Sequence, residues 1–127
     1  MKILVFGNPL VEKDSLVLRI LPGLRKKFPK IDFLEVEPTE DLGKFGKNLV
    51  ILDAVANADD VVMIDSIEQL ETNKIHSMHD FDLAYNLKIL KKLGLIETVK
   101  IIGVPMNMDE EEAIKKTGNL LLNIIST

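Results

Sequence analysis

Acidic and imidazole side chains from three separate segments are the residues of this sequence best suited to act together as metal ligands. Glu12 and Asp14 follow a first apolar run, and Asp53 lies near the end of a later one. The only two histidines, His76 and His79, precede an apolar helical pattern. Carboxylate oxygens and imidazole nitrogens are ligands that nickel and zinc accept in proteins. The three segments therefore predict a divalent-metal site, provided that the fold brings them to one edge.

Several of these residues also have explanations that need no ligand. Asp14 is a good helix N-cap, His79 stands just before a helix, and Asn8 suits the turn that follows Gly7. Asp53 differs because a carboxylate inside an apolar strand must be hydrogen bonded or ionised near water. Asp53 is thus the residue that an ordinary structural role explains least well.

The elements that must position these residues follow from the hydrophobic pattern. Apolar or alternating runs predict five strands, over residues 2–6, 31–37, 48–55, 60–64 and 99–105. Helical spacing predicts three helices, over residues 14–28, 79–94 and 109–125. Residues 38–46 are expected to form a loop with one helical turn.

Particular residues mark the ends of these helices. Pro22 predicts a kink or an early stop in the first helix, because proline removes a backbone hydrogen bond. Gly94 is expected to end the second helix. Asp109 and Glu112 have the spacing of a capping box at the start of the third. One face of the second helix is predicted to be buried, through Phe81, Ala84, Leu87, Leu90 and Leu83.

The order of elements predicts an α/β protein built as a three-layer sandwich. A mostly parallel, twisted five-stranded sheet would carry helices on both faces, in a single domain over residues 1–127. The expected arrangement is flavodoxin-like, with the first strand central. Ligands bind such sheets beyond the carboxyl ends of the strands, which is where the three candidate segments lie.

Composition excludes several classes of protein. The chain has 127 residues, a net charge of −4 and no cysteine, so disulfides, thiolate metal sites and a cysteine nucleophile are ruled out. No basic patch with interleaved aromatic residues favours nucleic acid. No apolar run is long enough for a signal peptide or for membrane insertion. A cytoplasmic location is expected.

Motifs of other catalytic classes are missing. The sequence has no Gly-x-Ser-x-Gly elbow, no P-loop and no dinucleotide fingerprint. A response-regulator receiver domain would use Asp53 as its phosphoacceptor. That class also needs an acidic pair after its first strand and a lysine after its fifth, where this sequence has "VFGN" and "IIGVP".

Four segments resemble the hydrogenase maturation endopeptidases: "KILVFGNPLVEKDSLVLRI", "NLVILDAV", "NKIHSMHDFDLAYNLKIL" and "VKIIGVP". They occur in the family's order and span nearly the whole chain. The most specific blocks are the Gly-Asn-Pro-Leu turn followed by an acid, the strand ending Asp-Ala, and the histidine followed by an apolar helix.

The resemblance implies a function. Members of this family cut a C-terminal extension from the large-subunit precursor of a nickel-iron hydrogenase after nickel has been inserted. The implied metal ligands are Asp14, Asp53 and His79, with Glu12 as a further candidate ligand. The metal would be nickel carried by the substrate, although other divalent metals could occupy the same donors. Gly7 and Asn8 would shape the turn that presents Asp14.

The sequence departs from the family pattern around this turn. Val5 stands where the family has its first glycine, Val17 replaces a glycine of the first helix, and Lys13 with Asp14 replaces an acidic pair. "ANADD" replaces the Pro-Gly turn that often follows the third strand. An alternative is therefore a non-catalytic hydrogenase-assembly subunit with the same fold.

Overall fold

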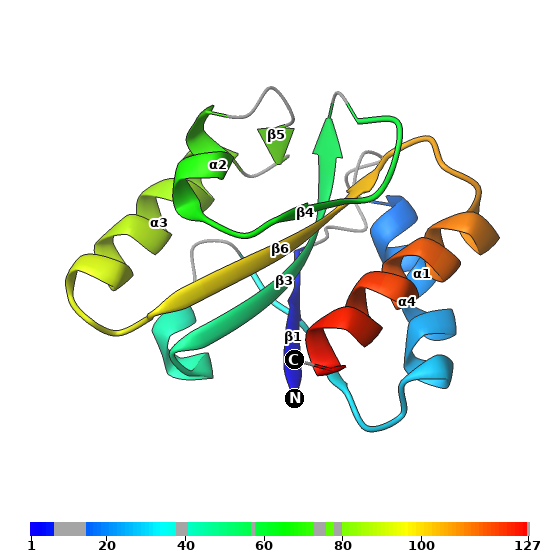
Figure 1. Ribbon diagram of the computed structural model, residues 1–127, viewed down its shortest axis with the longest axis horizontal. Helices are drawn as coiled ribbons and strands as arrows, with labels where there is room; N and C mark the ends of the chain where they lie inside the picture. Colours follow the sequence, from blue (N-terminus) through cyan, green and yellow to red (C-terminus); the bar gives the residue numbers. More distant parts are fainter. Residues whose placement is uncertain (7–14, 38–40, 57, 73–75, 78–79, 127) are drawn as a thin grey trace.

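The structure is a computed structural model that describes residues 1–6, 15–37, 41–56, 58–72, 76–77 and 80–126. Five main strands form one sheet in the order β2-β1-β3-β6-β4. They are β1 (Lys2–Val5), β2 (Asp32–Glu35), β3 (Asn48–Ala56), β4 (Val62–Ile64) and β6 (Thr98–Pro105). A two-residue strand, β5 (His76–Ser77), pairs with the end of β3. The predicted α/β class and mostly parallel, twisted sheet are confirmed (Figure 1).

The strand order corrects the flavodoxin-like expectation. β1, β2, β3 and β6 run parallel, but β3 rather than β1 is central, and β4 is an antiparallel edge strand beside β6. The physical reason lies in the connection from β3 to β4, which has only residues 57–61. A parallel crossover needs about a dozen residues or more. The chain can therefore only turn back, and β4 runs against its neighbour.

Helices cover both faces of the sheet, as the sequence predicts (Figure 1). α1 (Ser15–Lys27) and α4 (Glu110–Ser126) pack on one face, whereas α2 (Ile67–Thr72) and α3 (Asp80–Lys92) lie on the other. Successive residues of a strand point to opposite faces. Ile51 accordingly joins the core beneath α3, while Leu52 joins the core beneath α1 and α4.

The expected early stop at Pro22 is wrong. α1 continues from Ser15 to Lys27 with Pro22 inside it. Pro22 is exposed, so the carbonyl that loses its intrahelical partner lies on the water-facing side of the helix. The buried residues Ile20, Leu21 and Leu24 hold the opposite face against the sheet. Burial of these side chains outweighs one missing hydrogen bond.

The other predicted helix ends are confirmed. Gly94 has φ of 73°, and its N–H binds the carbonyl oxygen of Lys91 as α3 ends. Asp109 caps α4, because its Oδ2 accepts a hydrogen bond from the backbone N–H of Glu112. A 3₁₀ turn, η2 (Leu42–Phe45), supplies the helical turn expected in the second loop. No helix among the described residues is both long and apolar enough to cross a membrane.

Two elements were not predicted, namely α2 and β5. For α2 a signal exists in the sequence: Ser66 and Gln69 have the Ser-x-x-Gln spacing of a capping box. In the structure Ser66 Oγ accepts from the N–H of Gln69, and Gln69 Oε1 accepts from the N–H of Asp65. β5 is too short for any hydrophobic pattern to reveal it.

Candidate active site at the carboxyl edge of the sheet

Asp53 is a fully buried carboxylate in the central strand, with 0% of its surface exposed. Its Oδ1 accepts a 2.8 Å hydrogen bond from the backbone N–H of Ala54. Hydrogen bonds from backbone N–H groups stabilise an ionised carboxylate. By strand alternation Asp53 lies on the face that carries α2 and α3, since Leu52 and Ala54 pack on the other face.

Asp53 lies in β3 next to the point where β1 ends. The pairing of β1 with β3 ends at Val5 and Leu52, and the N–H of Phe6 binds the carbonyl oxygen of Leu52. Phe6 is fully buried in the core beneath α3. Phe6, the last described residue before the Gly-Asn segment of the sequence, is therefore hydrogen bonded to the residue that precedes Asp53.

β5 pairs antiparallel with the carboxyl end of β3. His76 is paired with Ala56, and Ser77 with Val55, in an antiparallel register. α3 begins three residues later at Asp80. The two segments that flank residues 78–79 therefore both lie at the carboxyl edge of the sheet, on the side where α3 starts (Figure 1).

Most of the predicted site residues lie outside the described residues. These are Gly7, Asn8, Glu12, Asp14 and His79, so their grouping with Asp53 stays a prediction. The structure shows instead that the described neighbours of both segments, Phe6 and Ser77, approach β3 within three residues of Asp53. Among the described residues alone, no three acidic or histidine side chains gather closely enough to hold a metal ion.

A hollow of about 470 Å³ opens at the same edge, where β3 and β6 end. Its walls come from the β3–β4 connection, the β6–α4 connection and the first turn of α4. Asp59, Asn107, Asp109 and Glu112 give it a polar, acidic lining. The sequence analysis assigned Asp109 and Glu112 only to a helix cap and did not find this hollow, because its two connections are about fifty residues apart.

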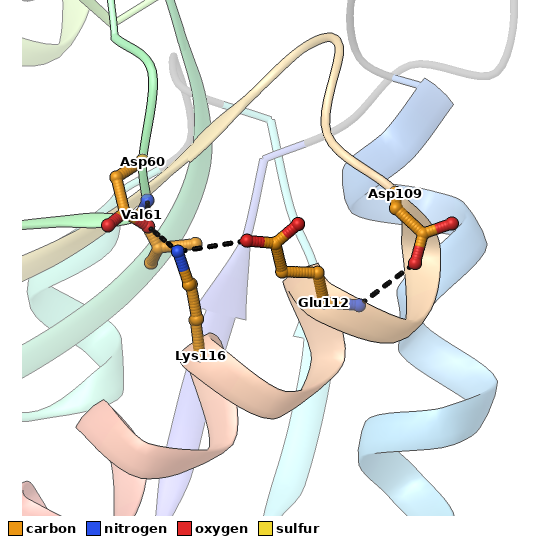
Figure 2. A network of polar contacts seen from close by, with 5 residues as sticks. All are labelled: Asp60, Val61, Asp109, Glu112 and Lys116. Atoms are coloured by element: carbon orange, nitrogen blue, oxygen red, sulfur yellow. Dashed lines mark hydrogen bonds and ion pairs between the residues drawn. The ribbon is translucent and has the colours of Figure 1, made fainter.

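A small ion-pair network borders the hollow (Figure 2). The Nζ of Lys116 lies 2.9 Å from Asp60 Oδ1 and 3.0 Å from Glu112 Oε1. Asp60 Oδ1 also accepts from the N–H of Val61. The hydrogen bond from Lys116 lowers the pKa of Asp60, with help from Val61, whereas bonds to Asp60 and Glu112 raise the pKa of Lys116. The network thus ties the β3–β4 connection to α4.

The arrangement of strands and helices matches a protein of known structure. The hydrogenase maturating endopeptidase HybD from E. coli superposes with a TM-score of 0.64, over 97% of this chain and 93% of that chain. This chain has the fold of that endopeptidase. The two sequences are 22% identical over the match. The match includes nearly all of both chains, so it extends over the sheet and the described helices on both of its faces.

No protein-family model and no curated protein sequence matches the chain. The likeness to the endopeptidase is therefore carried by the tertiary structure. It confirms the fold that the resemblance in the sequence implied.

Proposed function

We propose that this protein is an endopeptidase that removes the C-terminal extension of a nickel-iron hydrogenase large-subunit precursor after nickel insertion. The observation that carries the proposal is Asp53, a fully buried carboxylate at the carboxyl edge of a hydrogenase maturating endopeptidase fold. In this proposal the carboxylate of Asp53 supplies an oxygen ligand to a cation that the substrate brings.

In this proposal Asp14, Asp53 and His79 bind the nickel that the precursor carries, with Glu12 as an alternative ligand. Two carboxylates and one imidazole suit a borderline divalent ion, and zinc or a similar ion can occupy the same donors. The hydrogen bond from the N–H of Ala54 holds Asp53 in one orientation. Gly7 and Asn8 form the turn that presents Asp14.

Nickel then acts as the gate for cleavage. A precursor with nickel gains metal–ligand bonds to the protease that a metal-free precursor cannot form. Specificity is the difference between these two affinities. The protease therefore binds only large subunits whose metal has been inserted, and both proteins meet in the cytoplasm.

The test is a cleavage assay with purified large-subunit precursor, with and without nickel, read by mass spectrometry. We expect a shortened product only from the nickel-loaded precursor, and none from Asp53→Asn or His79→Ala. Asp53→Asn keeps the size of the side chain and an acceptor for the N–H of Ala54, so we expect the variant to fold. Asp32→Asn is the matched control, because Asp32 is an exposed aspartate at the amino end of β2. Full cleavage by both site variants would exclude the metal-ligand proposal.

Two other functions give distinct results. A non-catalytic assembly subunit would bind the precursor in a stable complex without shortening it. A receiver domain would accept phosphate on Asp53 from acetyl phosphate. The observed strand order disfavours the receiver, because receivers share the flavodoxin-like order 2-1-3-4-5, in which the fourth strand does not run antiparallel at the edge.

A further inference from the structure

Exposed large apolar side chains gather on α3 and the turn that follows it. Seven such residues are found in the described part of the chain, and four of them lie here: Tyr85, Ile89, Leu93 and Leu95. Tyr85 and Leu93 are about two-thirds exposed, at 65% and 66%. A concentration of this kind marks a binding surface more often than scattered apolar residues do.

Three of these residues form a stripe along the helix. Tyr85, Ile89 and Leu93 are spaced by four residues, and the N–H of Leu93 still binds the carbonyl oxygen of Ile89. Residues at this spacing lie on one helix face. We call Tyr85, Ile89 and Leu93 the α3 stripe. The face buried against the sheet is a different one, made by Ala84, Leu87 and Leu90.

α2 and α3 lie next to each other on one face of the sheet (Figure 1). A hollow of about 660 Å³ beside the α3 stripe is lined by residues of these two helices. Ile67 of α2, which is itself nearly buried, lines this hollow together with Tyr85 and Ile89. The stripe and the hollow together offer an apolar groove along a helix of 13 residues, which is roughly 20 Å long.

The rim of the groove is cationic, although the whole chain carries a net charge of −4. Among the described lining residues, Lys88, Lys91 and Lys92 are cationic and Glu68 alone is anionic. A second copy of the same surface would bring these lysines together, so self-association through a symmetric contact is disfavoured. An occupant with carboxylates around apolar side chains would instead be attracted to the rim.

We propose that the groove between α2 and α3 is a docking surface for an acidic, apolar segment of the hydrogenase precursor. This inference rests on the proposed function, because it takes the precursor as the occupant. α3 starts next to β5 at the carboxyl edge and extends away from it, so one partner can contact the α3 stripe and the candidate active site together. Docking here adds affinity without touching the bond that is cut.

The test measures precursor binding and cleavage for two double variants. Lys91→Glu with Lys92→Glu reverses the rim charge, and its matched control is Lys26→Glu with Lys27→Glu. Both pairs lie in the last turn of a 13-residue helix, so both disturb the helix dipole alike. Tyr85→Ala with Ile89→Ala shortens the stripe. Its matched control is the exposed apolar pair Leu122 and Ile125 of α4, also changed to alanine.

We expect each groove variant to raise the Kd for nickel-loaded precursor, and the KM for its cleavage, at least tenfold with kcat unchanged. The Kd and KM of the control variants should stay within twofold of the parent's values. Added salt should weaken precursor binding by the parent more than precursor binding by the Lys91→Glu, Lys92→Glu variant. Parent-like binding by both groove variants would overturn the docking proposal and leave the proposed function intact.

Two further outcomes would also overturn it. If the parent protein neither binds nor cleaves the precursor, the proposed function fails and the docking proposal fails with it. If the parent forms a dimer in size-exclusion chromatography that Tyr85→Ala with Ile89→Ala abolishes, a second copy covers the groove.

Discussion

Asp53 and Gly103 lie directly opposite each other in the parallel pair of β3 and β6. A Cβ atom on Gly103 would lie 2.5 Å from Cγ1 of Val55 and 3.1 Å from Cγ2 of Val62. These two valines therefore occupy the space that any side chain at residue 103 would need. A side chain at residue 103, beside the buried carboxylate, would therefore overpack this part of the sheet.

Gly103→Ala is expected to destabilise the protein by about 1–3 kcal/mol, the usual cost of overpacking a filled core. The measurement is the free energy of unfolding in urea. Gly118→Ala in α4 is the control, because its Cβ would come no closer than 3.6 Å to another residue. That change should be neutral or stabilise by up to about 1 kcal/mol, since alanine favours the helix. Equal effects of the two substitutions would contradict the close packing at Gly103.

Thr117→Val is expected to stabilise the protein by about 1 kcal/mol. Thr117 is fully buried in α4, and its Oγ1 has no hydrogen-bond partner among the described residues. Valine keeps the shape and removes the unsatisfied hydroxyl. Thr98→Val should instead destabilise the protein, because Thr98 is exposed and its hydroxyl donates a 2.7 Å hydrogen bond to Oδ1 of Asn48. Thermal unfolding of both variants checks the contrast, and a lower melting temperature for Thr117→Val would show that the hydroxyl is satisfied.

Lys116→Met is expected to lower the melting temperature by about 1–3 °C at neutral pH, because exposed ion pairs contribute little. The pKa of Asp60 is lowered, so its contribution is present above its ordinary value of 3.8 and is lost as pH falls through the lowered value. The pKa of Lys116 is raised, so its contribution is present below 10.5 and is lost as pH rises through the raised value. The difference between variant and parent should therefore vanish at both extremes of pH.

Melting curves measured across this pH range provide the check. Lys115→Met is the control, because Lys115 is the exposed neighbour of Lys116 in α4. It should lower the melting temperature less than Lys116→Met at neutral pH. If Lys116→Met lowers the melting temperature by the same amount at all pH values, the ion pairs are not the cause.

The proposed function predicts that cleavage of the nickel-loaded precursor falls at acid pH. A histidine must be neutral to bind a metal, and imidazole side chains ordinarily take up a proton near pH 6.5. In the proposed site His79 is a nickel ligand, so protons should compete with nickel for it, and the initial rate should drop by roughly tenfold per pH unit well below that range. Rates measured at several nickel concentrations distinguish competition from acid unfolding, because more nickel should restore cleavage only in the first case. A rate that is unchanged down to pH 5 would exclude a histidine ligand.

Local chemistry explains what could be read from the sequence alone. Gly94 ends α3 and Asp109 caps α4 through contacts within a few residues, so composition and spacing were sufficient to predict them. The nearly unbroken apolar run over residues 48–55 predicted a buried strand, and Asp53 stood out because it interrupts that run. The order of strands and helices then placed Asp53 at the carboxyl edge of an α/β sheet.

Tertiary structure decided everything that depends on contacts between distant residues. The short β3–β4 connection turned β4 antiparallel, and packing against the sheet carried α1 past Pro22. Asp53 meets Gly103 fifty residues later, and Lys116 meets Asp60 across a similar distance. Each of these outcomes is a competition between a local preference and burial or pairing elsewhere in the chain. Such a competition has no signature in any short stretch of sequence, because its energy exists only once the fold has brought the partners together.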